Sequence, residues 1–189
     1  MYMVLTTTEL YNKLELKNQE IILLSSLLEY YNNNKYFNIL IDIINGDNKI
    51  SKRTIEYFVT QYSIQNKIIY NYENSGEQSR FNVHNSYKNQ LKAYKKKYFD
   101  PFGRGDRIPF IVNDHCIITT IGQLNFYKWF FSKKIYDYCY DNYTNIQNSL
   151  LSIKKPFVKK QKNTKPNKPI NAYKSNINNN GRIMISFSL

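Results

Sequence analysis

Metal-ligating and redox-active side chains are scarce in this chain of 189 residues. Its cysteines and histidines number two each: Cys116, Cys139, His84 and His115. His115 and Cys116 are adjacent, so on a strand they would point to opposite faces and could hardly bind one ion together. Because no Cys-x-x-Cys spacing occurs, the sequence predicts neither a zinc site nor a disulfide scaffold. We expect no metal, no other cofactor and a reducing compartment.

Long apolar runs are also lacking. No stretch of 18 apolar residues occurs, which argues against a membrane span. The first six residues lack the charged start and the apolar run of a signal peptide. An intracellular location is therefore expected. Hydrophobic residues nevertheless make up 42% of the chain and aromatic residues 16%, enough for a packed core over at least the first three quarters.

Acidic residues are few where basic residues are many. Residues 80–107 hold eight basic and two acidic residues, and residues 142–189 hold nine basic and no acidic ones. Residues 1–79 hold seven basic and nine acidic residues, and 108–141 hold three of each. AT-rich coding would enrich lysine without selection, but it would not gather the net charge of +13 into two blocks. Such blocks are typical of proteins that bind nucleic acids or anionic surfaces; the alternative is a solubilising tail and one solvated helix face.

Periodicity predicts helices through the first hundred residues. The spacing of Thr6 and Glu9 fits a capping box, before a helix that reaches about Tyr31. A second helix is expected at 35–45, ended by Gly46, and a third at 52–64, capped by Ser51. A fourth is expected at 86–98, with tyrosines and a leucine on one face and five lysines over much of the rest.

Two hairpins are expected between these helices. Strands at 67–72 and 80–84 would be joined by a polar turn, and strands at 107–112 and 115–119 would flank Asn113-Asp114. Proline and glycine make 99–106 a loop. An aromatic helix at 124–131 follows a capping-box spacing at 120–123, and a last helix runs to about 143 or as far as 151.

The fold class predicted from these elements is α+β. We expect a helical segment at 1–48, an α+β core domain at 49–151 and a basic low-complexity arm at 152–189. Residues 154–174 hold eight lysines, three prolines and no acidic residue, a composition typical of disordered arms. The alternating residues 182–189 predict a short terminal strand, which would dock on the domain edge or add a strand to a partner.

The basic blocks supply the candidate site. Lysines can neutralise phosphates, and arginines can bind them through two hydrogen bonds. The predicted nucleic-acid-binding residues are Lys88, Lys92, Lys95, Lys96, Lys97, Arg104 and Arg107, together with Lys154, Lys155, Lys159, Lys160 and Lys162 of the arm. In the alternative, the tyrosines of the 86–98 helix belong to the core and its lysines are merely solvated. The aromatic run 126–131 could stack bases, but its helical spacing favours a place in the core.

The sequence contains few groups of residues that could form a catalytic site. Asp100 and Asp106 bracket the glycine loop and could hold a metal for phosphoryl chemistry. Their spacing better fits residues that cap a turn and pair with Arg104 or Arg107. We therefore expect no enzymatic activity and no small-molecule substrate.

Four segments carry a recognisable pattern: Ile50–Ser63, Asn85–Tyr94, Phe99–Arg104 and Thr119–Phe126. They resemble segments in proteins of giant nucleocytoplasmic large DNA viruses, especially relatives of mimivirus, and the similarity extends over about residues 45–145. The family pattern often reads Phe-Asp-Pro-Phe-Cys-Arg where this chain has Gly103. The resemblance implies a viral origin, and it supplies no catalytic residue.

The sequence thus favours a non-enzymatic viral protein that binds DNA or RNA. Genome packaging and transcription in the virus factory are the expected settings, in the host cytoplasm or in the virion interior. The alternative is a structural virion or assembly protein, whose partners would be other viral proteins that contact the aromatic region or the terminal strand.

Overall fold

Helices and two separate two-stranded antiparallel sheets form the protein, so the fold class is α+β, as predicted. The computed structural model describes residues 11, 13–32, 35–74, 76–112 and 115–153. Of the predicted arm at 152–189, residues 152 and 153 belong to the last helix, and the rest, with the terminal strand, lies outside the described residues. The predicted capping box at Thr6 and Glu9 also lies outside them.

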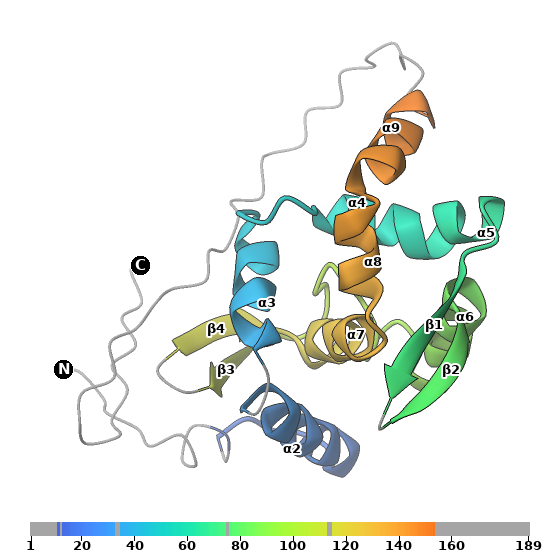
Figure 1. Cartoon of the computed structure of the whole chain (residues 1–189). Helices are drawn as coiled ribbons and strands as arrows, with labels where there is room; N and C mark the ends of the chain where they lie inside the picture. The colour runs from blue at the N-terminus through green and yellow to red at the C-terminus, as the bar shows by residue number, and fades with distance from the viewer. Residues whose placement is uncertain (1–10, 12, 33–34, 75, 113–114, 154–189) are drawn as a thin grey trace.

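The aromatic helix α7 (Ile121–Ser132) lies in the middle of the molecule, with the other elements arranged around it (Figure 1). Ten of its twelve residues are buried. Thr120 caps it as predicted, because Thr120 Oγ1 accepts a hydrogen bond from the Gln123 amide at 3.0 Å. A helix with apolar side chains on every side has to be enclosed. The core interpretation of residues 126–131 is therefore confirmed, and these rings are not available to stack bases.

Two N-terminal helices, α2 (Asn18–Asn32) and α3 (Tyr36–Asn45), pack against α7. The Tyr31 hydroxyl donates to the Leu124 carbonyl at 2.8 Å. The ring of Tyr36 stacks on Phe131, with centroids 4.8 Å apart and an interplanar angle of 1°. Gly46 ends α3 in a left-handed conformation with φ 89°, as the sequence predicted.

The predicted first helix is interrupted. Tyr11 is helical, residues 13–17 are not, and α2 starts at Asn18. Glu20, the third residue of the helix, accepts the Lys17 amide on Oε2 at 3.0 Å. This half of a capping box satisfies an amide that the helix itself leaves unpaired, so it fixes the start of α2.

One long helical segment follows Ser51. It consists of α4 (Lys52–Tyr57), a π-helical turn η1 (Phe58–Tyr62) and α5 (Ser63–Gln65). Ser51 Oγ accepts the Thr54 amide at 3.1 Å, which confirms the predicted cap. The π turn was not predicted.

The first hairpin is longer than predicted and has a shorter turn. Strands β1 (Ile69–Asn74) and β2 (Glu77–Asn82) pair from Ile69 with Asn82 to Asn74 with Glu77. The alternation at Tyr70 and Tyr72 places both rings against the core, and Tyr70 donates to the Lys133 carbonyl at 2.7 Å. The pairs Glu73 with Gln78 and Asn74 with Glu77 extend the ladder into residues that composition alone assigns to a turn.

The second hairpin matches its prediction. Strands β3 (Ile108–Val112) and β4 (His115–Thr119) pair antiparallel. Phe110 of β3 packs its ring against Tyr31 and Phe37, which ties this hairpin to the N-terminal helices.

Helix α6 (Val83–Tyr94) starts and ends earlier than predicted. Asn82 Oδ1 accepts the Asn85 amide at 2.9 Å and begins the helix. The helix ends at Lys95, whose φ is 55°. Lys95, Lys96 and Lys97 are therefore not helical, which corrects the prediction of one helix with five lysines.

The C-terminal helical stretch is divided into α8 (Ile135–Asp141) and α9 (Tyr143–Ile153), where the sequence predicted one helix. Helix α9 packs along α4, and Tyr57 and Ser149 share a hydrogen bond of 2.6 Å.

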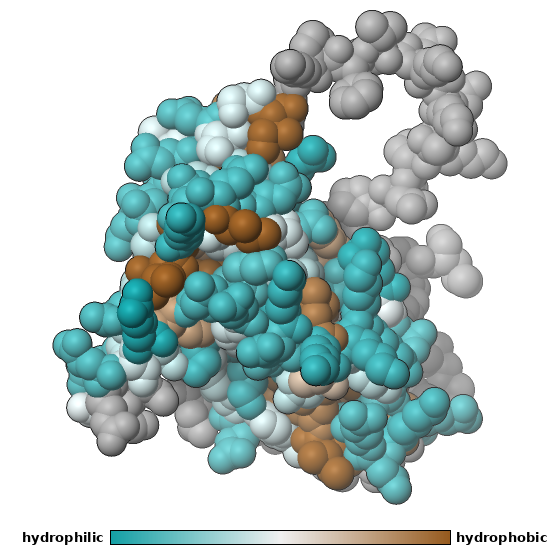
Figure 2. All heavy atoms as spheres, turned by 90° about the vertical axis from the view of Figure 1, so that its right-hand side faces the viewer, coloured by the Kyte–Doolittle hydropathy of each residue, from teal (hydrophilic) through white to brown (hydrophobic). Residues whose placement is uncertain are grey.

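One hydrophobic cluster extends from Leu24 to Leu150. It contains residues from both sides of the boundary predicted at 48–49, which stays a prediction. On the face that carries β1, β2 and α6, hydrophilic surface predominates and the apolar surface is broken into patches (Figure 2). Within the described residues, no helix is both long and apolar enough to cross a membrane.

The enclosure of α7 gives a stability prediction. Phe130 is fully buried, so Phe130→Ala should lower the free energy of unfolding by about 3–5 kcal/mol through lost burial and a cavity. Ile22 is 72% exposed, and Ile22→Ala should change the free energy by less than about 0.5 kcal/mol. Urea unfolding followed by circular dichroism measures both. Equal losses in the two variants would contradict the central place of α7.

Candidate nucleic-acid interface

Four of the predicted lysines lie on the surface of the described part of the chain. Lys88 and Lys92 are exposed residues of α6, four positions apart and hence on one face of the helix. Lys95 and Lys96 are exposed in the turn that follows. Among the described residues, none of the four side chains has a hydrogen bond or an ion pair. We call these four residues the lysine face.

The opposite side of α6 packs on the core. The ring of Tyr87 lies 6.0 Å from those of Phe99 and Trp129. Trp129 Nε1 donates to Ser86 Oγ at 3.0 Å, and Tyr94 packs against the same cluster. The predicted alternative is thus confirmed for the tyrosines. Because their rings face inward, the lysine face offers cations and no stacking surface.

Lys97 differs from its neighbours, because it is paired. Its Nζ lies 2.9 Å from Glu20 Oε1, and the Tyr98 hydroxyl donates to the same oxygen at 2.8 Å. Together with the Lys17 amide, these donors lower the pKa of Glu20 to about 2, the amide contributing most. The Lys97 charge therefore joins the turn to α2 and is partly neutralised.

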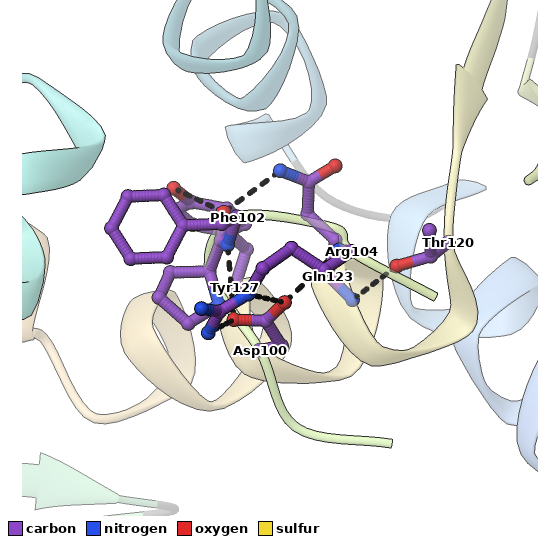
Figure 3. A network of polar contacts seen from close by, with 7 residues as sticks. Asp100, Phe102, Arg104, Thr120, Gln123 and Tyr127 are labelled. Carbon is purple, nitrogen blue, oxygen red and sulfur yellow. Dashed lines mark hydrogen bonds and ion pairs between the residues drawn. The ribbon is translucent and has the colours of Figure 1, made fainter. Parts of the chain in front are cut away.

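Arg104 is paired as well. Its Nε and Nη2 donate to Asp100 at 3.1 and 2.9 Å, and its amide donates to Oδ2 at 3.0 Å (Figure 3). Burial opposes the ionisation of Asp100, but these bonds outweigh it and hold the pKa of the carboxyl below its ordinary value. The predicted pairing of Asp100 with Arg104 is confirmed. The guanidinium is therefore occupied by Asp100, and its hydrogen bonds stabilise the loop.

The loop is also fastened to the start of α7. Gln123 Nε2 donates to the Pro101 carbonyl at 2.8 Å (Figure 3). Gly103 has a φ of 62°, and a Cβ there would lie 2.6 Å from Gln123 Oε1. A Cβ at Gly122 would lie 2.6 Å from the Lys97 carbonyl. Both glycines let the segment that carries the lysines pack closely on α7.

Arg107 is exposed and, within the described residues, has no ion pair or hydrogen bond. It borders a cavity of about 220 Å³ between the start of α7 and residues 14–20. Among the described residues, five of the seven predicted cations of the 80–107 block are therefore unpaired: Lys88, Lys92, Lys95, Lys96 and Arg107. The predicted arm residues Lys154, Lys155, Lys159, Lys160 and Lys162 lie outside the described residues.

Metal-ligating side chains and thiols are the other candidate groups in the sequence. No group of three or more His, Cys, Asp or Glu side chains that could hold a metal ion occurs there. Burial raises the pKa of Cys116 and Cys139, which keeps both thiols protonated and weakly nucleophilic near neutral pH.

Two residues that hold the site together were not predicted from the sequence. Glu20 and Gln123 are 77 and 22 residues from the groups they bind, Lys97 and Pro101. Gln123 could have been suspected, because its spacing from Thr120 fits a capping box; its side chain instead reaches the loop. No local pattern connects Glu20 with Lys97.

The low pKa of Glu20 gives a pH prediction. The carboxylate is more favourable in the folded than in the unfolded protein, so its stabilising contribution is present above an unfolded pKa of about 4.5 and is lost as the pH falls toward about 2. Glu20→Gln should lower the free energy of unfolding at pH 7 by about 1–2 kcal/mol. It should also flatten the fall in stability between those pH values. Urea unfolding at several pH values measures this, and an unchanged acid profile would contradict the role of Glu20.

The comparisons with known proteins agree with the resemblance in the sequence. Residues 6–188 match the model of a family of unknown function, DUF7197. The chain is 42% identical over 110 residues to the uncharacterized protein L507 of Acanthamoeba polyphaga mimivirus. That match covers 55% of this chain and 42% of the relative, and it supports a viral origin. No solved structure matches the chain significantly. The chain therefore belongs to the DUF7197 family of unknown function.

Proposed function

We propose that this protein binds nucleic acid without acting on it chemically. The lysine face is the main contact surface, with Arg107 beside it and the 154–162 lysines of the arm as a less specific addition. The observation that carries the proposal is the division of the cations in the 80–107 block. Two of them are paired with carboxylates, whereas the lysine face is exposed and has no ion pair with any described residue.

The packing of α6 and of the turn that follows it supports this function. Helix α6 packs on the core through Tyr87 and Ser86, and the turn after it is held by Glu20 and by α7. The four lysines therefore project from a fixed surface. Cations on such a surface attract a polyanion, and binding releases the counterions that surround the phosphates.

The expected mode of binding is contact with phosphates. The aromatic rings of α6 and α7 face the core, so the lysine face has no described partner for base stacking. Lysine ammonium groups contact phosphate oxygens without reading bases. Binding at this face should therefore depend steeply on salt and weakly on sequence.

The similarity to a mimivirus protein suggests a viral setting for this binding. A sequence-independent binder suits genome packaging, and it would also suit transcription in the virus factory. Its partners would then be the viral DNA or RNA, in the host cytoplasm or inside the virion.

The second candidate is a virion or assembly protein that binds other viral proteins. Ile64 and Ile69 are 49% and 42% exposed near the start of β1. Exposed apolar side chains that lie close together are typical of protein contacts. The aromatic helix α7 is buried, so such a partner would not bind there.

Removal of the lysine face tests the leading proposal. In Lys88→Gln/Lys92→Gln/Lys95→Gln/Lys96→Gln, the slope of log affinity against log salt for duplex DNA should decrease by roughly 0.9 for each lost phosphate contact. Fluorescence anisotropy at several salt concentrations measures the slope, and circular dichroism checks the fold.

A matched control removes the same charge elsewhere. Lys13, Lys17, Lys35 and Lys67 are exposed lysines outside the 80–107 block. Their combined replacement by Gln should leave the slope nearly unchanged. If both quadruple variants lose the same affinity and slope, net charge alone is responsible and the lysine face is not the site.

Deletion of residues 154–189 separates the two candidate functions. The nucleic-acid proposal predicts weaker retention on DNA or RNA with the lysine face still active. The assembly proposal predicts loss of a viral protein partner that survives nuclease treatment. Affinity purification from infected cells, with and without nuclease, distinguishes these results. Nucleic-acid binding confined wholly to the deleted segment would contradict the role of the lysine face.

A further inference from the structure

The cavity beside Arg107 has room for a small organic molecule. Its volume is about 220 Å³, well above the roughly 15 Å³ that one water molecule needs. Segments that are far apart in the sequence enclose it: residues 14–20, the loop that leads into β3, and the start of α7. Glu20 binds the side chains of Lys97 and Tyr98, which also line the cavity. The walls of the cavity are therefore connected to one another by tertiary contacts.

Side chains of both charges border this cavity. Glu15 and Asp106 supply carboxylates and Arg107 supplies a guanidinium, and all three residues are exposed. Among the described residues, none of these three side chains has an ion pair or a hydrogen bond. The other two charges of the lining, Glu20 and Lys97, are paired with each other at 2.9 Å. Opposite charges therefore border one space without neutralising each other directly.

This mixture of charges determines which ligand fits. A simple anion beside Arg107 is repelled by the two carboxylates, and a simple cation beside the carboxylates is repelled by Arg107. A molecule that carries both a carboxylate and an ammonium group can meet each charge of the cavity with its opposite. The guanidinium can bind a carboxylate through two hydrogen bonds, and the carboxylates can accept hydrogen bonds from an ammonium group. The cavity thus selects a zwitterion.

Apolar side chains supply the rest of the recognition. Leu14 and Leu16 are half-buried, and Ile108 and Ile121 are 3% and 6% exposed. An apolar group that leaves water to contact these residues gains free energy in proportion to the area it buries. An apolar lining with a few charged groups is the usual composition of a small-molecule site.

We propose that this cavity binds a free α-amino acid with an apolar side chain. Arg107 binds the α-carboxylate, Glu15 and Asp106 bind the ammonium group, and the leucines and isoleucines of the lining contact the side chain. This site goes beyond the proposed function, because its ligand is not a polyanion and contacts no residue of the lysine face. The sequence did not predict it, since Glu15 and Asp106 are far apart in the chain.

Three probes of the same shape separate the two charges of the ligand. L-leucine carries both charges, isoamylamine lacks the carboxylate, and isocaproate lacks the ammonium group. Each is titrated at constant ionic strength into the full-length protein with labelled leucine and isoleucine methyl groups, and NMR records the shifts. L-leucine should shift the methyl signals of the four apolar residues of the cavity in a saturable manner, with the exposed Ile22 unchanged. The two single-charge probes should bind at least about tenfold more weakly.

Substitutions assign each charge of the ligand to its partner. Arg107→Gln should weaken L-leucine binding about tenfold and isoamylamine binding not at all, because only the carboxylate contact is lost. Glu15→Gln and Asp106→Asn should weaken L-leucine binding and leave isocaproate binding no weaker. Arg53 and Glu73 are exposed and lie outside the lining of the cavity, so Arg53→Gln and Glu73→Gln are the charge-matched controls and should retain the affinity. Circular dichroism confirms that each variant is folded.

The length of the ligand's side chain provides a second readout on the parent protein. Glycine, alanine, valine and leucine should bind with increasing affinity, by roughly fourfold for each added carbon. The absence of a saturable shift at the cavity, binding of isocaproate or isoamylamine as tight as that of L-leucine, or an equal loss in the control variants would overturn the proposal. A protein that binds L-leucine but no nucleic acid would refute the proposed function and leave this site intact.

Discussion

The enclosure of the aromatic helix α7 is the constraint on which the rest of the structure depends. Its buried side chains are distributed around the whole helix, so water must be excluded on every side. Helices α2 and α3 contact it through Tyr31 and Tyr36, and α6 does so through Tyr87. Each of these elements is itself amphipathic. Its apolar side is used for the core, and its polar side becomes the surface of the molecule.

The pattern of surface charge follows from this packing. The segment from Lys95 to Arg104 connects α6 to β3 across the start of α7, and close backbone contact at Gly122 keeps it there. Asp100 and Glu20 each fix this path by pairing with a cation. Among the described residues, the predicted cations that remain unpaired are those of the lysine face and Arg107. The cations of one sequence block thus divide into groups that build the loop and groups that stay available to a polyanion.

Much of the fold could be predicted from local patterns, because local chemistry determines it. Ser51, Thr120 and Gly46 cap helices where their spacing predicted. The start of α2 could not be predicted, since it depends on Glu20, whose carboxylate also receives Lys97. The end of α6 was missed because lysine is a good helix former, whereas Lys95 takes a positive φ. The candidate lysines were identified from charge density, but the pairing of Lys97 with Glu20 arises only from the tertiary fold.

If the exposed cations after β2, and not the whole basic surface, contact nucleic acid, a DNA duplex should perturb only the part of the protein that carries them. Titration of the isotope-labelled protein with a short duplex, followed by backbone amide NMR, measures this. Shift changes should be concentrated at residues 83–97 and 105–107, with α2, α3 and α8 unaffected. Changes spread evenly over all exposed lysines, or confined to α2 and α8, would contradict the proposed interface.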